Sequence, residues 1–276
     1  MMIMSPMIRE SGSPSTSPTA VNGVVLSPWV SWSPQEYLAG YYRFVEPDEI
    51  ETIRFISQAS RRLKVPANIL VFGCGPTLHH VFPIAPYASE IHLADYLPGN
   101  LDQIRAWIEQ RAPYHDWSAF VRYTLQCEGV AEPDHDDVSL REAMVRRKIT
   151  RLFQADAGDF NPLGCDAREA YPIVVSCYCA DSATGNKDTW HLYMSNISSM
   201  LADEGFFVTA ALHRANYYKV GERYFPSADV DERDLRAFLN QVLGHEVAIE
   251  THVLPSHEAL GYTGIVLGHA VKQASR

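Results

Sequence analysis

A short apolar segment that ends in a glycine turn is the feature that most constrains the fold of this chain. Residues 68–72 read Asn-Ile-Leu-Val-Phe, Gly73 and Gly75 follow, and a second apolar segment at residues 91–94 stops at Asp95. In α/β proteins such a turn lets a ligand approach bare backbone, and an acid about twenty residues later accepts hydrogen bonds from ribose hydroxyls. The pattern predicts a site for a nucleoside cofactor.

The same turn discriminates between two classes of cofactor. A dinucleotide pyrophosphate favours a third glycine three residues after Gly75, but Leu78 occupies that position and Pro76 follows Gly75 directly. S-adenosyl-L-methionine carries ribose and adenine without phosphate, so it requires only the open turn and the acid. The residues therefore favour S-adenosyl-L-methionine. The alternative, in which the glycines only make a tight turn, stays open at this point.

The composition narrows the class of partner. The 276 residues include 33 acidic and 23 basic side chains, a formal net charge of −10. This balance favours solubility and argues against nucleic acid as a partner, so we expect a small substrate that is neutral or cationic. No apolar segment has the roughly 18 residues of a membrane span, and no signal-peptide pattern is present. We expect a cytoplasmic protein with no membrane partner; its oligomeric state stays open, with a monomer favoured.

The cysteines and acidic clusters do not predict a metal site. Five cysteines are an odd number in a long chain and indicate reduced thiols. Cys177 and Cys179 flank Tyr178 without a second pair at zinc-finger spacing, and the acidic residues 132–137 lack the glycine of a calcium loop. We interpret the first as buried thiols at a strand end and the second as a solvated loop before a helix. No metal is expected.

The chain divides into a tail and one domain. Residues 1–27 are rich in serine and proline and are predicted to be a disordered tail. One domain is expected over 28–276, with a helical cap at 28–66 and an α/β core at 67–276. The alternation of the core predicts a mainly parallel sheet with helices on both faces. Strands are expected near 68–72, 90–94, 151–155, 172–177, 205–211, 246–253 and 262–268, and helices near 77–84, 98–111, 116–126, 138–148, 187–202 and 231–242.

Four motifs occur in a characteristic order. They are the residues 33–42, Ser-Pro-Gln-Glu-Tyr-Leu-Ala-Gly-Tyr-Tyr; the residues 73–77, Gly-Cys-Gly-Pro-Thr; Asp95 and Tyr96 with Asn100; and the residues 116–118, Asp-Trp-Ser. Together they resemble the small-molecule N-methyltransferase family that includes nicotinamide, phenylethanolamine and indolethylamine N-methyltransferases, over most of residues 29–270.

The resemblance implies a fold and an activity. The fold is the α/β class I methyltransferase fold, a Rossmann-like, seven-stranded, mostly parallel sheet whose last strand is antiparallel, with an N-terminal helical cap. The activity is transfer of a methyl group from S-adenosyl-L-methionine to a nitrogen of a small-molecule amine or nitrogen-containing metabolite.

The resemblance also implies which residues hold the cofactor. The turn passes beneath the methionine portion, the acid and its neighbours hold ribose and adenine, and two tyrosines close on the amino-acid end. The cofactor-binding residues expected are Tyr37, Tyr42, Gly73, Cys74, Gly75, Thr77, His79, Asp95, Tyr96, Asn100, Asp156, Ala157 and Cys177.

Some positions depart from the family. Val71 stands where an acid is frequent, and His79 where an aromatic residue is frequent. Ala210 and His213 replace the acids associated with nicotinamide and phenylethanolamine. The departures at Ala210 and His213 disfavour both molecules as substrates, whereas those at Val71 and His79 bear on how the methionine end of the cofactor is held.

The candidates for chemistry lie after the central strands. Methyl transfer needs positioning and desolvation, together with a group that takes the proton of an amine. Asp181 and His213 are the candidate catalytic residues, and Tyr41, Tyr178, Asp181, His213 and Tyr218 the candidate substrate-binding residues. Structural alternatives stay open: Asp181 as a helix cap, His213 as a hydrogen-bonded structural residue, Tyr218 as a core residue, and the leader tyrosines as one buried helix face.

Three rival functions are retained. The first is an O- or S-methyltransferase with the same cofactor site. The second is a nicotinamide-dependent oxidoreductase, which Leu78 disfavours. The third is a non-catalytic cofactor-binding module.

Overall fold

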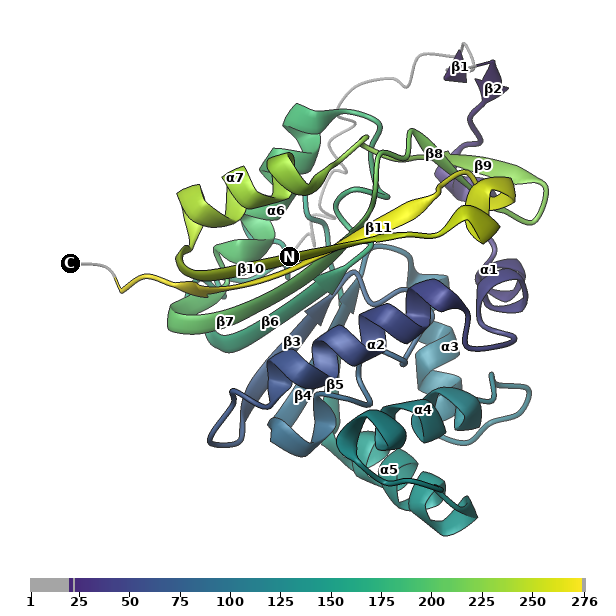
Figure 1. The fold of residues 1–276 in the computed structure, drawn as a ribbon, viewed down its shortest axis with the longest axis vertical. Coiled ribbons are helices and arrows are strands. Elements are labelled where there is room, and N and C mark those ends of the chain that lie inside the picture. Colours follow the sequence, from purple (N-terminus) through teal and green to yellow (C-terminus); the bar gives the residue numbers. More distant parts are fainter. Residues whose placement is uncertain (1–19, 22, 275–276) are drawn as a thin grey trace, which may run out of the picture.

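The computed structural model describes residues 20–21 and 23–274. Most of the tail predicted over residues 1–27 therefore lies outside the described residues. The strands β1 (Ala20–Val21) and β2 (Val24–Val25) form a short antiparallel pair, seen in Figure 1 at one end of the molecule. Within the described part of the chain, no helix is both long enough and apolar enough to cross a bilayer.

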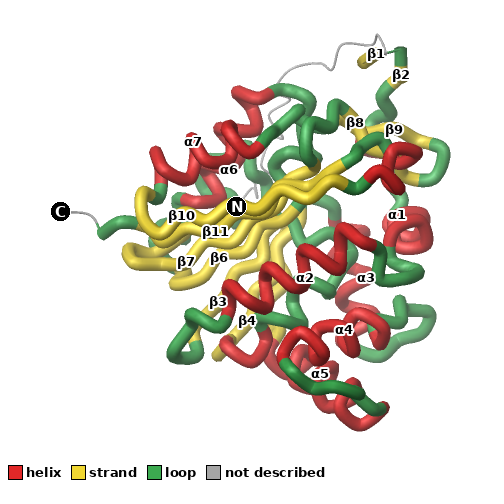
Figure 2. The backbone as a smooth tube through the Cα atoms, viewed as in Figure 1, coloured by secondary structure: helices red, strands yellow, loops and turns green. Residues whose placement is uncertain are grey.

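A seven-stranded sheet forms the centre of the molecule (Figures 1 and 2). The strand order is β10-β11-β7-β6-β3-β4-β5, and β11 runs antiparallel to both of its neighbours while the other pairs are parallel. This arrangement confirms the predicted fold class and all seven predicted strands. The strands are β3 (Ala67–Phe72), β4 (Ala88–Asp95), β5 (Ile149–Gln154), β6 (Tyr171–Cys177), β7 (Leu201–Leu212), β10 (Gly244–Val253) and β11 (Gly264–Lys272).

Two separate apolar cores cover the two faces of the sheet. Ile69 and Val71 of β3 enter one core, and Leu70 and Phe72 enter the other, because successive side chains of a strand point to opposite faces. The first core takes side chains from α2 (Pro47–Ser60), α3 (Pro98–Ile108), α4 (Ser118–Glu128) and α5 (His135–Lys148), and the second from α6 (Lys187–Ser198) and α7 (Glu232–Val242). Both groups of helices can be followed in Figure 2.

The helix predicted over residues 77–84 is wrong. This segment forms a series of turns, with hydrogen bonds from the backbone N–H groups of Val81 and Phe82 to the carbonyl of Leu78. Pro83 has no N–H to donate to the preceding turn, and a proline disfavours helical backbone at the residue before it. The other predicted helices are present within a few residues of their expected ends.

A hairpin that the sequence patterns did not indicate lies beside the N-terminal cap. The strands β8 (Tyr217–Val220) and β9 (Arg223–Pro226) pair antiparallel, next to the short helix α1 (Pro34–Tyr41). Tyr41 Oη donates to the carbonyl of Lys219 at 2.7 Å. The ring of Trp29 stacks on that of Phe225 at 5.1 Å. The cap and the hairpin therefore form one unit above the carboxyl ends of the strands, as Figure 1 shows.

The glycine turn after β3 is closely packed. Gly73 has φ +68, and a Cβ built on it would lie 2.1 Å from Cys179 Sγ. The backbone N–H groups of Gly73 and Cys74 donate to the carbonyl of Ala94 at 2.8 and 3.1 Å. The absence of a side chain at Gly73 therefore lets the segment after β6 pack against the turn after β3.

Replacement of Gly73 by alanine is expected to destabilise the protein by about 2–4 kcal/mol, the sum of overpacking and left-handed backbone strain. Gly129→Ala is the matched control, since Gly129 has φ +105 with nothing within 4 Å of an added Cβ, and it is expected to cost only about 1 kcal/mol. Denaturant unfolding measures both. In a Cys179→Gly background the cost of Gly73→Ala should fall to that of the control; an unchanged cost would contradict the packing argument.

Candidate active site

Asp95 forms the polar centre of the site. It is the last residue of β4 and is only 6% exposed. Its Oδ2 accepts from the N–H of Gly75 at 2.7 Å, and its Oδ1 accepts from the N–H of Leu97 and from Asn100 Nδ2, both at 2.9 Å. Burial raises the pKa of Asp95, and these three hydrogen bonds oppose that rise. A carboxylate has about four acceptor positions, so one remains on the cavity side.

The N-terminal cap is tied to this centre by a hydrogen bond. Trp32 Nε1 donates to Asn100 Oδ1 at 3.1 Å, and Asn100 in turn donates to Asp95. The Tyr37 ring packs on Trp32 at 4.9 Å, and its hydroxyl lies 3.0 Å from that of Tyr42. The aromatic leader and the glycine turn therefore border the same cavity.

These residues surround a cavity of about 310 Å³. Four carboxyl side chains line it, those of Asp48, Glu49, Asp95 and Asp156, and among the described residues no lysine or arginine does. The remaining lining is Trp29, Trp32, Tyr37, Tyr41, Tyr42, Phe72, Gly73, Cys74, Gly75, Thr77, His80, Tyr96, Leu97, Asn100, Ala155, Ala157, Cys177, Tyr178, Cys179, Ser182, Ala183, Tyr193, Leu212, Tyr218 and Tyr262. The volume lies within the range of small-molecule sites, and the lining is aromatic and acidic.

The first turn of α2 contributes two acids to the cavity wall. Asp48 Oδ1 lies 3.1 Å from His257 Nε2, and its Oδ2 accepts from the hydroxyl of Tyr262 at 2.7 Å. Burial acts to raise the pKa of Asp48, but the hydrogen bond and charge of His257 and the bond from Tyr262 hold it below its usual range. Asp48 is thus a fully partnered carboxylate.

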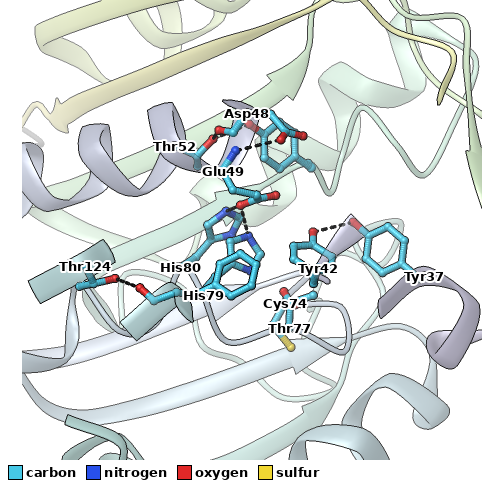
Figure 3. A network of polar contacts seen from close by, with 12 residues as sticks. Tyr37, Tyr42, Asp48, Glu49, Thr52, Cys74, Thr77, His79, His80 and Thr124 are labelled. Atoms are coloured by element: carbon cyan, nitrogen blue, oxygen red, sulfur yellow. Dashed lines mark hydrogen bonds and ion pairs between the residues drawn. The ribbon is translucent and has the colours of Figure 1, made fainter. Parts of the chain in front are cut away.

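Glu49, unlike Asp48, lies beside two histidines. His79 and His80 both point toward the Glu49 carboxylate (Figure 3). His79 Nε2 lies 2.7 Å and His80 Nε2 3.9 Å from Glu49 Oε2, and all three residues are buried. Burial raises the pKa of Glu49 well above its usual range and lowers that of His79 to about 3. Burial likewise lowers the pKa of His80. Glu49 and His80 line the cavity, whereas His79 stands behind them.

The structure brings most of the predicted site residues to this cavity. Those that line it are Tyr37, Tyr41, Tyr42, Gly73, Cys74, Gly75, Thr77, Asp95, Tyr96, Asn100, Asp156, Ala157, Cys177, Tyr178 and Tyr218. His79, Asp181 and His213 do not line it.

The two candidate catalytic residues have partners elsewhere. Asp181 is 1% exposed, and its Oδ2 accepts from the N–H of Leu212 at 2.9 Å and from the Ser182 hydroxyl at 3.2 Å. Burial raises its pKa to about 6. His213 Nε2 lies 3.0 Å from Glu232 Oε2 at the start of α7. Asp181 therefore holds the end of β7 in place, and His213 contacts Glu232 rather than the cavity.

The sequence patterns missed Asp48, Glu49, His80 and Tyr262. Two acids after Pro47 are ordinary chemistry for the first turn of a helix, so they gave no signal of a site. The adjacent histidines were the available signal, but a regular helix over residues 77–84 would have directed them to different faces.

The comparisons with known proteins agree with this geometry. The sequence profile of the NNMT/PNMT/TEMT family matches residues 29–264. Indolethylamine N-methyltransferase of Mus musculus is 27% identical over 70% of this chain and 75% of its own length. Nicotinamide N-methyltransferase of Homo sapiens is 25% identical over 76% of this chain and 81% of its own length.

A solved structure shows the same fold. N-methyltransferase NodS of Bradyrhizobium japonicum, in complex with S-adenosyl-L-homocysteine, superposes with a TM-score of 0.53 at 14% identity, and the match covers 87% of this chain and 97% of NodS. S-adenosyl-L-methionine also fits the residues present here, because Asp95 keeps an acceptor position for ribose and the cavity has acids but no lysine or arginine among the described residues to oppose a sulfonium. The chain therefore belongs to the NNMT/PNMT/TEMT family and is an S-adenosyl-L-methionine-dependent N-methyltransferase with the class I fold.

Proposed function

We propose that this enzyme methylates a nitrogen of a small, neutral or cationic amine or nitrogen-containing metabolite. The one-sided composition of the cavity lining carries the proposal: within the described ranges it includes four carboxyl side chains and no lysine or arginine. An acceptor with a carboxylate or phosphate would enter without a counter-charge, whereas an ammonium or neutral amine would not be repelled.

The cofactor end is assigned to the elements around Asp95. We infer that Asp95 holds the ribose, assisted by Asn100, and that Tyr96, Asp156 and Ala157 border the adenine. The buried, donor-rich position of Asp95 supports this assignment. The remaining predicted cofactor contacts, Tyr37, Tyr42, Gly73, Cys74, Gly75, Thr77 and Cys177, line the same cavity, which supports their assignment to the methionine end.

The acceptor end of the cavity is assigned to its aromatic wall, opposite the cofactor end. When bound, the cofactor supplies an electrophilic methyl group on a sulfonium, so the protein must position the acceptor and exclude water. Tyr218 is buried there, Tyr178 is half-buried, and the Tyr41 ring packs on that of Tyr37 at 4.9 Å. The Tyr178 hydroxyl lies 2.6 Å from that of Thr52, and Tyr218 Oη donates to the carbonyl of Ser182 at 3.3 Å. Rings held in this way present rigid faces to a planar or cationic acceptor.

Asp181 and His213 receive indirect roles in this proposal. Asp181 positions the Leu212 segment of the wall through its hydrogen bond to the backbone. His213 supports the start of α7 through Glu232. We also propose a cytoplasmic location, which the five free cysteines support.

An acceptor panel tests the proposal. With isotopically methyl-labelled S-adenosyl-L-methionine, small aromatic and aliphatic amines are compared with matched analogues that carry a carboxylate on the same scaffold. We expect kcat/KM for the amines to exceed that of the acidic analogues at least tenfold, about 1.4 kcal/mol, because the cavity offers the added charge no partner. Mass spectrometry locates the methylated atom.

Several outcomes of the panel would contradict the proposal. They are methyl transfer to oxygen or sulfur in preference to nitrogen, equal turnover of the acidic analogues, and reduction of a substrate with NADH or NADPH in place of methyl transfer.

The assignment of Asp95 predicts the effect of Asp95→Asn. The amide cannot accept from all three donors, so affinity for S-adenosyl-L-homocysteine should fall about 10- to 100-fold, the worth of one or more charged hydrogen bonds. Titration calorimetry measures the affinity. Asp102→Asn, on an exposed position of α3, is the control and should leave it unchanged. Retention of wild-type affinity by Asp95→Asn would remove the ribose assignment.

The tie between the cap and Asn100 predicts the effect of Trp32→Phe. The ring is kept but the donor is lost, so affinity for S-adenosyl-L-homocysteine should fall about fivefold, the net worth of one neutral hydrogen bond. Trp29→Phe is the matched control, because Trp29 also lines the cavity but packs on Phe225 by stacking. If both variants lose affinity equally, the hydrogen bond has no special part in holding the cap.

A further inference from the structure

A buried cluster of two imidazoles and one carboxylate borders the acceptor end of the cavity. His79 Nε2 and His80 Nε2 converge on Glu49 Oε2, with one ligand atom from each residue within 4.8 Å of the others. Figure 3 shows the carboxylate of Glu49 above the two rings. The cluster is distinct from the donors around Asp95. His79, which the family resemblance also places among the cofactor contacts, packs on Tyr42 with ring centroids 4.7 Å apart.

Several polar atoms of this cluster lack hydrogen-bond partners among the described residues. They are Glu49 Oε2, both ring nitrogens of His79 and Nε2 of His80, all of them buried. Although His79 Nε2 lies 2.7 Å from Glu49 Oε2, neither atom is aligned for a hydrogen bond to the other. A buried unpartnered polar atom costs about 1–3 kcal/mol, so such atoms are rare unless something else satisfies them.

The irregular backbone of residues 77–84 brings the two histidine rings together. Successive residues of an α-helix diverge by about 100°, so adjacent histidines on a helix would not face one point. The irregular turn before Pro83 instead places the centroids of the His79 and His80 rings 3.7 Å apart. Glu49 reaches the same point from the buried face of α2.

We propose that Glu49, His79 and His80 bind one divalent first-row transition-metal ion, with zinc as the probe. Two imidazoles and a carboxylate are a donor set used for zinc and for iron(II). Ligand atoms about 2.0–2.2 Å from such an ion lie roughly 3.3–3.6 Å from one another in tetrahedral coordination. The observed separations of 2.7 and 3.9 Å from Glu49 Oε2 lie on either side of that range, so small side-chain rotations suffice.

The position of the site indicates what the ion contacts besides the protein. Glu49 and His80 line the cavity, and His79 lies behind them, so the open coordination positions face the cavity rather than the core. Three protein ligands leave room for water or for a donor atom of the acceptor. An acceptor with a second nitrogen or oxygen donor beside the methylated nitrogen fits this arrangement.

Measurements of zinc content and of zinc affinity, made on the whole chain, test the proposal. The protein is stripped with a chelator, offered zinc chloride, dialysed and analysed by elemental mass spectrometry. We expect about one zinc per wild-type chain, and at least a tenfold weaker zinc affinity, measured against a chromophoric chelator, in Glu49→Gln, His79→Ala and His80→Ala. His252→Ala is the matched control, because His252 lies between Glu51 and Glu250 at the surface and should not affect the bound zinc.

Two further measurements keep the proposal open to refutation if a variant fails to fold. Circular dichroism shows whether each variant is native. Since Glu49 and His80 are not among the residues assigned to the cofactor, binding of S-adenosyl-L-homocysteine should persist in their variants and in the metal-free protein. X-ray absorption at the zinc edge of the wild type should show nitrogen and oxygen ligands only. A chain that retains no zinc, zinc unaffected by all three variants, or sulfur ligands from cysteines would overturn the proposal. None of these outcomes would alter the proposed methyl transfer.

Discussion

One buried carboxylate joins the elements that make the cavity. Asp95 accepts hydrogen bonds from the turn after β3, from the backbone after β4 and from α3 through Asn100, and Trp32 of the cap donates to Asn100. A buried carboxylate without donors would cost several kcal/mol, so each of these elements must be in place for Asp95 to stay ionised. The group that is assigned to the cofactor is therefore also the group that aligns the turn, the helix and the cap.

The sheet could be predicted from the sequence because the local sequence of each strand favours a strand. Apolar runs bounded by turns gave all seven strands, and the glycine turn with Asp95 pointed to the cavity in which we propose that the cofactor binds. The helix over residues 77–84 failed because Pro83 removes a backbone donor that the apolar pattern does not report. The β8–β9 hairpin was missed because its two strands of four residues are too short to show an alternating pattern.

The acceptor end was harder to predict because it depends on contacts between distant segments. Asp48 meets His257 and Tyr262, more than two hundred residues away in the chain, and Glu49 meets the histidines of an irregular turn. None of these pairings has a sequence spacing that marks it. Asp181 was predicted from its place after a central strand, but the side-chain direction that turns it to Leu212 depends on packing across β6 and β7.

The carboxyl groups of the cavity differ in how many of their oxygens accept hydrogen bonds. This difference separates their roles. Asp95 and Asp48 have donors on both oxygens, so each is committed to holding protein elements in register. Within the described part of the chain, Oε2 of Glu49 has no hydrogen-bond partner, and the same holds for both ring nitrogens of His79 and for Nε2 of His80. The turn that supplies those histidines gives up regular helical hydrogen bonding, which is itself unfavourable. Two unfavourable features therefore coincide at one wall of the cavity, namely buried polar atoms without hydrogen bonds and an irregular turn. A bound cation would satisfy those polar atoms, whereas the apolar side chains around them do not.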